Sequence, residues 1–293
     1  MNKIKQLYDK VYCLLILVGI CYLLWFMVEI LCFASIRIPS DSMTPELIPG
    51  DHILVEKWSM GARIFKFWKC RRGTEVDIHR LPTLGILKRN DVLVFNFPYY
   101  ECWDSMGIDW RRYYVKRCVA LPGDTFSIED GMYRVKGYDA PLGNVESQED
   151  LVALLKRSRS EPQFVSMRAY PLNDSVPWTI KDFGPFYIPK KGASIIMNIP
   201  NAILYRNAIE WEQKKPIGIK GDSILLGDSL ITEYRFKENY YFTTGDNVMN
   251  SQDSRYWGLL PEPHIVGKAR WVWKSINPYT DKIRWERTLK KVE

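Results

Sequence analysis

Three short polar clusters carry the groups in this sequence that could do chemistry: residues 38–51, 114–124 and 245–258. The first cluster holds Ser42, and the second holds Lys116 between apolar neighbours in a predicted strand. A serine hydroxyl becomes a strong nucleophile when a base removes its proton, and a lysine amine is such a base only when neutral. Apolar surroundings disfavour the ammonium and can lower the pKa by several units from about 10.4. The clusters therefore suit serine chemistry with a lysine base, although each alone also fits an ordinary turn or a solvated strand edge.

The sequence lacks the usual motifs of other catalytic chemistries. The chain has three histidines, His52, His79 and His264, and none belongs to an HExxH motif. There is no glycine-rich phosphate loop, no GxGxxG, no GxSxG elbow and no SxxK pair. We therefore expect no metal and no cofactor. The number of histidines alone does not exclude a catalytic triad built on one of the three.

The elements that must hold these clusters are mostly short strands. Runs rich in β-branched and aromatic residues alternate with turn signals such as Pro-Gly-Asp at 49–51 and 122–124. Strands are expected at 52–55, 92–95, 113–115, 183–188 and 240–242, and helices at 148–159 and 202–215. This pattern predicts a mostly-β protein. Its middle third, residues 125–237, has no dense motif and is interpreted as an inserted second lobe with short helices.

An uncharged run from residue 11 to residue 28 stands out from an otherwise ordinary globular composition. Its apolar character continues to Ala34, and about 20 helical residues cross a hydrocarbon core of roughly 30 Å. A cleaved signal peptide is the alternative, but its apolar region is usually only about 7 to 15 residues long and ends at a small-x-small site. We expect a retained single-pass anchor at 11–34. Three lysines and one aspartate precede it, which predicts that residues 1–10 are cytoplasmic and that the remainder lies outside.

The formal net charge of +7 is a small excess over 293 residues. Two stretches are locally basic, residues 57–72, where aromatic residues interleave with the cations, and residues 268–293. Such segments can bind nucleic acid, but a domain outside the cytoplasm seldom meets any, so lipid headgroups are the better partner. A solvated loop is the alternative for residues 57–72.

Three cysteines lie outside the expected anchor: Cys70, Cys102 and Cys118. Their odd number, wide spacing and lack of a CxxC pair argue against a zinc site and against a disulfide framework. One bridge among the three stays open, because the sequence cannot select the pair.

The clusters, taken in order, resemble the sequence boxes of bacterial type I signal peptidases. These boxes are a transmembrane anchor, SM-x-P at 42–45, an R-x-D-V-x-V-F-like strand at 89–95, KR-x-x-x-x-PGD at 116–124 and GDN-x-x-x-S-x-D-S-R at 245–255. Five features in one order make the match specific. The resemblance implies a signal-peptidase-like antiparallel β-sheet as the catalytic core, formed by residues 35–124 and 238–293, and leaves the second lobe unassigned.

The resemblance also implies a role for each polar residue. Ser42 would be the nucleophile, Lys116 the general base and Ser251 a hydroxyl that orients the lysine amine. The Ser42 backbone N–H and the Ser40 hydroxyl would hold the oxyanion. Four charged residues match the family's ion-pair set, for which structural support is the favoured interpretation: Arg117, Asp246, Asp253 and Arg255.

Substrates of this family carry small residues at the first and third positions before the cut, so the resemblance implies two shallow apolar pockets. The matching positions are all apolar: Ile38, Met43, Leu47 and Val115 for the first pocket, and Ile36, Ile53, Val94 and Val115 for the third. An extended substrate would add as a strand beside them. Two departures are present. Val248-Met249 replaces the usual Arg-Asp, which puts a peripheral ion pair in doubt, and Glu46 replaces the usual Thr at the pocket rim.

Together these observations predict a membrane-bound signal peptidase I, a serine endopeptidase that removes N-terminal signal peptides from exported preproteins with a Ser/Lys dyad. Its expected partners are preprotein signal peptides and membrane lipids, without nucleic acid. We expect a monomer in the cytoplasmic (inner) membrane with its catalytic domain on the periplasmic side. Two alternatives stay open. A specialised maturation peptidase of the same architecture fits equally well, whereas an inactive signal-peptide-binding homologue is disfavoured because Ser42, Lys116 and Ser251 are all retained.

Overall fold

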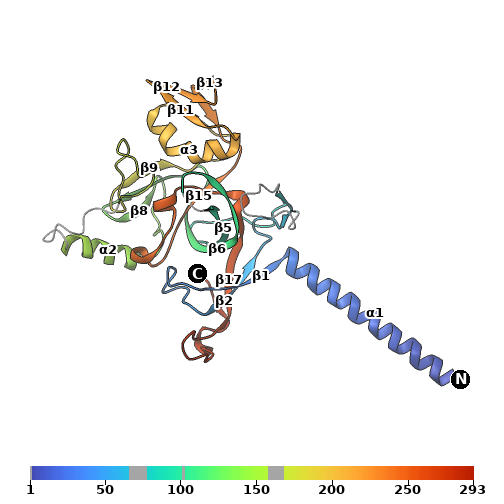
Figure 1. The fold of residues 1–293 in the computed structure, drawn as a ribbon. Helices are drawn as coiled ribbons and strands as arrows, with labels where there is room; N and C mark the ends of the chain where they lie inside the picture. The colour runs from blue at the N-terminus through green and yellow to red at the C-terminus, as the bar shows by residue number, and fades with distance from the viewer. Residues whose placement is uncertain (1, 66–77, 101–102, 158–167) are drawn as a thin grey trace.

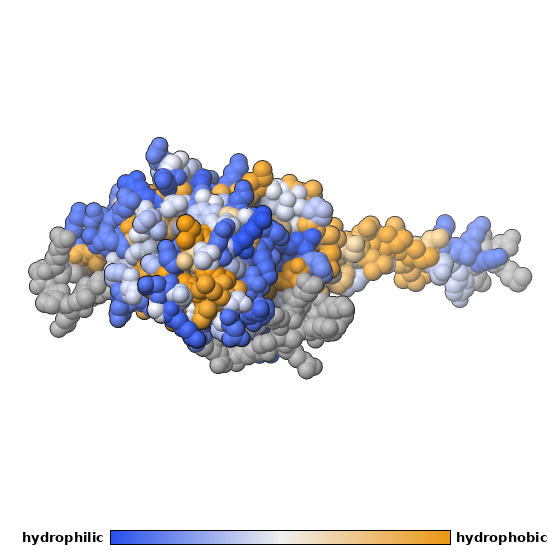
Figure 2. All heavy atoms as spheres, turned by 90° about the horizontal axis from the view of Figure 1, so that it is seen from above, coloured by the Kyte–Doolittle hydropathy of each residue, from blue (hydrophilic) through white to orange (hydrophobic). Residues whose placement is uncertain are grey.

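The first element of the protein is a long helix that stands away from the body (Figure 1). The computed structural model describes residues 2–65, 78–100, 103–157 and 168–293. Helix α1 (Asn2–Leu31) contains a stretch, Lys5–Glu29, that is long and apolar enough to cross a membrane and is not buried against the rest of the protein. Apolar side chains cover this helix, and polar ones gather towards its N-terminal end (Figure 2). Among the described residues, one helix that could cross a membrane is therefore present, and it overlaps the anchor predicted at 11–34.

The helix ends earlier than the apolar run does. Phe33 and Ala34, which we expected at the end of the anchor, are the first residues of strand β1 (Phe33–Arg37). They pair with Glu56 and Val55 of strand β2, and the Phe33 ring packs edge-on against Trp58 with 4.8 Å between ring centroids. Apolar character alone cannot distinguish the last turn of a membrane helix from the first residues of a half-buried strand.

The body is built on one antiparallel β-sheet, which confirms the mostly-β prediction. The strand order is β1-β2-β17-β5-β6-β15-β16, and β18 pairs with β17. The bounds of the strands that follow β1 are β2 (Asp51–Glu56), β5 (Val92–Tyr99), β6 (Met106–Ala120), β15 (Tyr240–Thr244), β16 (Leu260–Pro261), β17 (Ile265–Ser275) and β18 (Lys290–Lys291). The chain attaches to its anchor at the β1 edge, and β15 and β16 form the opposite edge.

Strands β5 and β6 form the centre of this sheet. All eight residues of β5 are buried, and its Val, Phe and Tyr side chains are typical of a strand covered on both faces. Strand β6 runs far beyond the predicted residues 113–115, because the register with β5 shifts twice after Asn96 and lets the strand bend. Strand β17 was not predicted, since Lys268, Arg270 and Lys274 interrupt its apolar pattern.

The described residues between β6 and β15 form a second lobe of small sheets and two helices. Its elements are β7 (Thr125–Glu129), β8 (Met132–Val135), α2 (Val145–Arg157), β9 (Phe183–Tyr187), β10 (Ser194–Ile196), α3 (Ile199–Gln213), β11 (Ile217–Lys220), β12 (Ser223–Leu226), β13 (Ser229–Leu230) and β14 (Glu233–Arg235). Both helices begin three residues before the predicted starts. Asn144 and Asn198 cap them by accepting bonds from backbone N–H groups of Ser147 and Asn201.

The second lobe shares its hydrophobic core with the sheet. Phe126 of β7 packs on Phe242 of β15 with 4.5 Å between ring centroids, and Phe183 and Phe186 of β9 also contact Phe242. One cluster of buried residues runs from β5 through these rings to α3. The lobe is thus packed against the sheet rather than tethered to it.

The remaining short elements connect the larger ones. Strands β3 (Arg63–Ile64) and β4 (His79–Arg80) pair with each other, and the one-turn helices are η3 (Val248–Asn250), α4 (Ser254–Trp257), η4 (Glu262–His264) and η5 (Trp285–Arg287). Part of the basic stretch 57–72, as well as Cys70 and Cys102, lies outside the described residues. Cys118 is buried with a free thiol, so it takes part in no bridge.

The last residues of the chain hold the turn that follows β1. Arg287 donates two hydrogen bonds to the buried Asp51 carboxylate, at 3.1 and 2.6 Å, and one to the Glu46 carbonyl at 2.9 Å. Lys290 binds the Glu46 carboxylate at 3.0 Å, and so does the backbone N–H of Glu293, at 3.1 Å. Burial alone would raise the pKa of Asp51, but the bonds from Arg287, Ile48 and Ser275 lower it. Glu46, the residue that departs from the family pattern, is therefore an acceptor for the C-terminal segment.

We predict that Arg287→Leu lowers the free energy of unfolding by about 2 kcal/mol, because it leaves a buried carboxylate without its cation. The measurement is urea denaturation of the full chain in detergent. The matched control is Arg168→Leu, which breaks an ion pair with Asp174 whose side chains are 50% and 97% exposed, and which should change stability by less than about 0.5 kcal/mol. Equal effects of the two substitutions would contradict this role for the C-terminal segment.

Candidate active site

The Lys116 amine, from the second sequence cluster, lies against the Ser42 hydroxyl, from the first cluster. Lys116 Nζ donates to Ser42 Oγ at 2.6 Å, although 74 positions separate the two residues. Lys116 projects from β6, and Ser42 lies in the turn between β1 and β2 that the C-terminal segment holds. Since the distance is short for an N–H···O bond, the two groups are in direct proton-transfer range.

Burial changes the acidity of this amine. The Lys116 side chain is only 3% exposed, and desolvation lowers its pKa to about 8. The Asp253 carboxylate opposes this shift, and the Arg255 guanidinium adds to it. A lysine with an ordinary pKa would be almost entirely protonated at neutral pH, whereas at this pKa about one tenth of Lys116 is neutral at pH 7. The site therefore contains a lysine that can act as a base.

The backbone around Ser42 leaves one donor free. The Ser42 carbonyl accepts a bond from the Asn247 N–H at 3.1 Å, which ties the first cluster to the third. Among the residues that the structure describes, none accepts a hydrogen bond from the Ser42 N–H. The Ser40 hydroxyl lies 3.4 Å from Ser42 Oγ. An oxygen atom bound beside Ser42 Oγ would thus find an unpaired N–H and a hydroxyl close by.

Ser251 lies beside the Ser42 backbone but does not bind Lys116. Its hydroxyl is buried, and it lies close enough to the Asp253 carboxylate to help lower the pKa of that group. Gly245 separates the two serines: a methyl group at this position would lie 2.2 Å from Ser251 Oγ and 2.5 Å from the Ser42 carbonyl oxygen. No side chain fits there, so the approach of the third cluster to the nucleophile turn requires glycine. Sequence reasoning placed Gly245 in a motif without assigning it this function.

Two pairs of charged residues brace the strands and turns around the site. Arg255 binds Asp253 through two bonds of 2.8 Å, and both side chains are fully buried. Burial alone would raise the pKa of Asp253, but the charge and hydrogen bonds of Arg255 lower it. Asp253 also accepts a bond from the Gly245 N–H at 2.9 Å, so the pair fixes the position of Gly245. The second pair joins Arg117 of β6 to Asp246 through bonds of 2.7 and 2.6 Å.

The four residues expected as ion-pair partners therefore form two bidentate pairs. Arg117 reaches further and donates to the Asn90 carbonyl at 2.8 Å and to the Glu293 carbonyl at 2.5 Å. The departure at Val248-Met249 does not open a gap. Val248 is buried with its carbonyl bound to Arg255 at 2.9 Å, and Met249 points outward, half exposed.

A cleft of about 380 Å³ opens beside Ser42 and Lys116. Of the seven predicted pocket residues, four line it: Ile36, Ile38, Met43 and Val115. The other three, Leu47, Ile53 and Val94, are fully buried and pack behind the cleft wall in one apolar cluster with Ile38, Met43 and Val115. The sequence predicted their apolar character correctly, but it could not separate residues that face a cleft from those that support them.

The cleft also contains residues that we did not predict. Tyr114 lies two positions before Lys116 on β6, on the same side of the strand, and its ring centroid is 5.6 Å from Lys116 Nζ. The Tyr114 hydroxyl donates to the Gln252 side chain at 3.1 Å. Asn250 binds the Asp41 carboxylate at 3.0 and 3.2 Å. The two-residue period of a strand was the signal that could have identified Tyr114.

Histidine and metal chemistry find no support at this cleft. The pKa of His264 falls to about 3 through burial, and its ring binds the Gly107 carbonyl at 3.1 Å. His52 packs against Trp273. Within the described ranges, no three His, Cys, Asp or Glu side chains gather as a metal site. The titratable side chain in contact with Ser42 Oγ is Lys116, and none of the described residues that line the cleft is a histidine.

Comparisons with known proteins give one family. The family model described as "Signal peptidase, peptidase S26" matches residues 11–274. Signal peptidase I of Buchnera aphidicola subsp. Schizaphis graminum is 29% identical over 252 residues, which cover 85% of this chain and 70% of that protein. Signal peptidase I of Haemophilus influenzae is 26% identical over 277 residues, with coverage of 89% and 70%.

A crystal structure of a signal peptidase I from Enterococcus faecalis V583 also matches, with 20% identity over 64% of this chain and 98% of that chain. Its TM-score of 0.28 is too low to bear on the fold. The family model, by contrast, spans the anchor, all three polar clusters and most of the sheet. The chain belongs to the signal peptidase family, peptidase S26.

Proposed function

We propose that this protein is a membrane-anchored signal peptidase I that cleaves signal peptides from preproteins with Ser42 as nucleophile and Lys116 as general base. The observation that carries the proposal is the 2.6 Å bond between Lys116 Nζ and Ser42 Oγ, together with the lowered pKa of that lysine. The membership in the peptidase S26 family makes the enzyme a serine peptidase, and no metal or cofactor enters the proposed mechanism.

The mechanism begins when neutral Lys116 takes the proton of Ser42 as Oγ attacks the scissile carbonyl carbon. The carbonyl oxygen gains the negative charge, and the Ser42 N–H and the Ser40 hydroxyl are the donors proposed to stabilise it. Lys116 then gives the proton to the leaving amine, which frees the mature protein and leaves the signal peptide esterified to Ser42. Water attacks this ester with Lys116 again as base, and Ser42 Oγ recovers the proton.

We propose that the Ser251 hydroxyl accepts a hydrogen bond from protonated Lys116. Its hydroxyl is buried beside the turn that carries Ser42 and next to the Asp253 carboxylate. An ammonium has three donors, and Ser42 Oγ accepts only one of them. A buried hydroxyl beside the nucleophile turn is a suitable second acceptor once Lys116 holds the proton. In this proposal Ser251 is a positioning residue.

The cleft suits a substrate with small side chains next to the cut. Ile36, Ile38, Met43 and Val115 give it an apolar wall, and its volume of about 380 Å³ is small for a peptide-binding site. We propose that the substrate lies extended across this wall, with the residues first and third before the cut turned towards it. A larger side chain at either position would meet the close-packed cluster that supports the wall.

The membrane placement follows from two parts of the chain. Helix α1 anchors the protein, and the three lysines before its apolar run favour a cytoplasmic N-terminus and a periplasmic catalytic domain. Tryptophans of β17 and η5, Trp271, Trp273 and Trp285, are 41 to 73% exposed among basic residues of the C-terminal stretch. Exposed tryptophans beside cations suit the interface between lipid and water, so we propose that this face touches headgroups and that the protein acts as a monomer.

A specialised maturation peptidase is the second candidate. It would use the same dyad and cleft, and the half-exposed Met249, at a position where the family usually has Asp, is the feature that favours it. Comparing cleavage rates across a set of unrelated preproteins separates the two, since a general enzyme processes most of them. An inactive homologue is disfavoured, because the short Ser42–Lys116 bond would have no function in it.

We predict that Ser42→Ala and Lys116→Ala each reduce cleavage of a preprotein in detergent by about a thousandfold or more, because each removes half of the dyad. Lys116→Arg should be as inactive as Lys116→Ala, since a guanidinium keeps the charge but stays protonated. The matched controls are exposed residues of the second lobe, Ser229→Ala and Lys191→Ala, which should cleave normally. Cleavage that survives either dyad substitution would overturn the mechanism.

We predict that kcat/KM rises about tenfold per pH unit below pH 8 and levels off above it, because the neutral amine is the active form. The sign follows from the lowered pKa of Lys116: activity is present above about pH 8 and is lost as the pH falls through that value. Initial rates on a short peptide are the measurement, with circular dichroism at each pH to exclude unfolding. A profile that is flat from pH 6 to pH 10 would contradict the lysine base.

We predict that Gly245→Ala lowers kcat at least about a hundredfold, because the new methyl displaces the Ser42 carbonyl and Ser251. Gly19→Ala in helix α1 is the matched control, since its methyl would meet nothing within 4 Å. Thermal unfolding distinguishes a displaced nucleophile from global destabilisation. Normal kcat for Gly245→Ala would show that the close approach of the two segments has no catalytic importance.

A further inference from the structure

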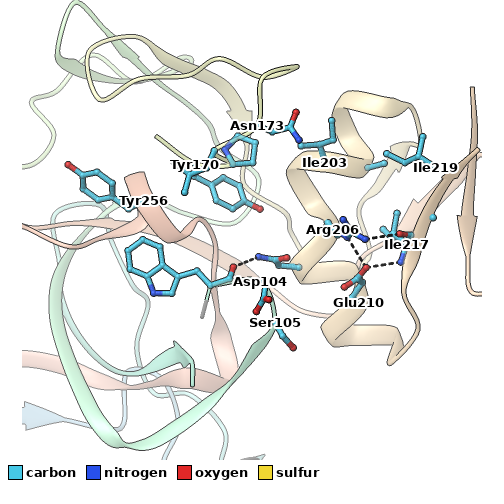
Figure 3. Close-up of a pocket in the computed structure, with 16 residues that line it drawn as sticks. Asp104, Ser105, Tyr170, Asn173, Ile203, Arg206, Glu210, Ile217, Ile219 and Tyr256 are labelled. Carbon is cyan, nitrogen blue, oxygen red and sulfur yellow. Dashed lines mark hydrogen bonds and ion pairs between the residues drawn. The ribbon is translucent and has the colours of Figure 1, made fainter. Parts of the chain in front are cut away.

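A second cavity, of about 810 Å³, lies between the sheet and the second lobe. Helix α3 and strand β11 form one wall, and Tyr170 and Tyr256 lie on the other side (Figure 3). The loop with Asp104 and Ser105 closes one end. The proposed mechanism uses none of these residues, so the cavity needs a separate explanation.

Strand β11 presents an open edge to this cavity. It pairs with β12 on one side only, in a three-stranded sheet of order β11-β12-β13. The Ile217 N–H donates to the Glu210 side chain at 2.8 Å, and its carbonyl accepts a bond from Arg206 at 3.2 Å, so both groups point away from β12. Because backbone groups two residues apart point the same way, Ile219 turns its N–H and its carbonyl to the same open edge. Neither group has a partner among the described residues.

The lining suits an extended peptide of varied sequence. Ile203, Ile217 and Ile219 give an apolar surface, and Ile219 is 45% exposed. The charges of Arg206 and Glu210 are already paired at 3.0 Å, so they offer little selection for a charged ligand. A free strand edge binds the main chain of a peptide through hydrogen bonds, and the apolar side chains beside it then select among peptide side chains.

The cavity lies next to the catalytic cleft and on its far side from the anchor. Gln252 lines the cleft, and Tyr256, four residues further along in the one-turn helix α4, lines the cavity. The anchor joins the sheet at β1, whereas α4 follows β15 at the opposite edge. In Figure 1 the lobe with α3 and β11 lies at the opposite end of the body from α1.

The direction of the substrate connects these observations. The apolar part of a signal peptide precedes the cut and lies in the membrane, so the chain after the cut leads away from the anchor. We propose that the cavity between α3 and β11 binds the mature part of the preprotein, just after the cleavage site, as an added strand on the edge of β11. The inference rests on the proposed function and extends it to substrate binding beyond the catalytic cleft.

Proline at position 219 tests the free edge directly. Proline removes the outward N–H and places its ring where an added strand would lie, yet it spares the bonds to β12. In Ile219→Pro we expect KM for a preprotein to rise roughly 3- to 10-fold, the value of one or two hydrogen bonds, with kcat unchanged. Cleavage of a short peptide that ends just after the same cut should be unaffected, because it does not reach the cavity.

A matched variant controls for disturbance of the small sheet. Leu230→Pro makes the same change at the opposite edge, on β13, where the Ile231 N–H bonds inward to Ile224 and the Leu230 N–H therefore points outward. Leu230 is 63% exposed and lies outside the cavity, so this variant should cleave both substrates normally.

The outcomes separate this inference from the proposed function. Normal preprotein KM in Ile219→Pro, an equal effect on both substrates, or an equal effect of Leu230→Pro would each overturn the inference while short-peptide cleavage continued. Photo-crosslinking adds a readout other than activity: a preprotein with a photoreactive side chain after the cut should label α3 or β11 of the Ser42→Ala protein, and labelling confined to other elements would overturn the inference. If wild type cleaves neither substrate, the proposed function fails, and this inference fails with it.

Discussion

The contact on which the rest of the structure depends is the bond between a buried lysine amine and a serine hydroxyl. An ammonium loses several kcal/mol of hydration free energy on burial. A lysine amine can therefore be buried only if the fold holds it in place and allows it to lose its proton. The 3% exposure of Lys116 and its pKa of about 8 are two consequences of this constraint. The apolar cluster under the nucleophile turn and the ring of Tyr114 both shield this amine from water.

Keeping the amine dry requires firm support for segments that come from distant parts of the sequence. The buried pair of Arg255 and Asp253 holds Gly245, and Gly245 permits the third cluster to reach the turn that carries Ser42. The C-terminal segment holds the same turn from its other side through Arg287. Breaking a buried pair leaves an uncompensated charge, so these contacts make the position of the nucleophile insensitive to small movements elsewhere.

In the function that we propose, the arrangement of the sheet also orders the path of the substrate. The anchor enters at β1, the cleft lies over β6 and the turn after β1, and the second cavity lies beyond β15. A preprotein tethered in the membrane by its signal peptide would meet these features in that order. This path would explain why the second lobe shares one core with the sheet and packs firmly beside the site.

The sequence by itself determined the features that are local. Uncharged length identified the anchor, since about 20 apolar residues span a bilayer whatever their neighbours are. Alternation of β-branched residues with turn signals predicted a mostly-β body, and the order of five features predicted the family and the roles of Ser42 and Lys116. Each of these signals depends on a short stretch of sequence, so it can be recognised without knowledge of the packing.

Only the tertiary structure decided which distant residues meet. Leu47 and Val94 support the cleft wall, while Ile38 faces the cleft, although all three are equally apolar in sequence. The need for glycine at position 245 arises from atoms of two other segments, and the open edge of β11 exists because no strand pairs with it. Burial, the lowered lysine pKa and free hydrogen-bonding groups are properties of contacts between segments, which a single sequence does not contain.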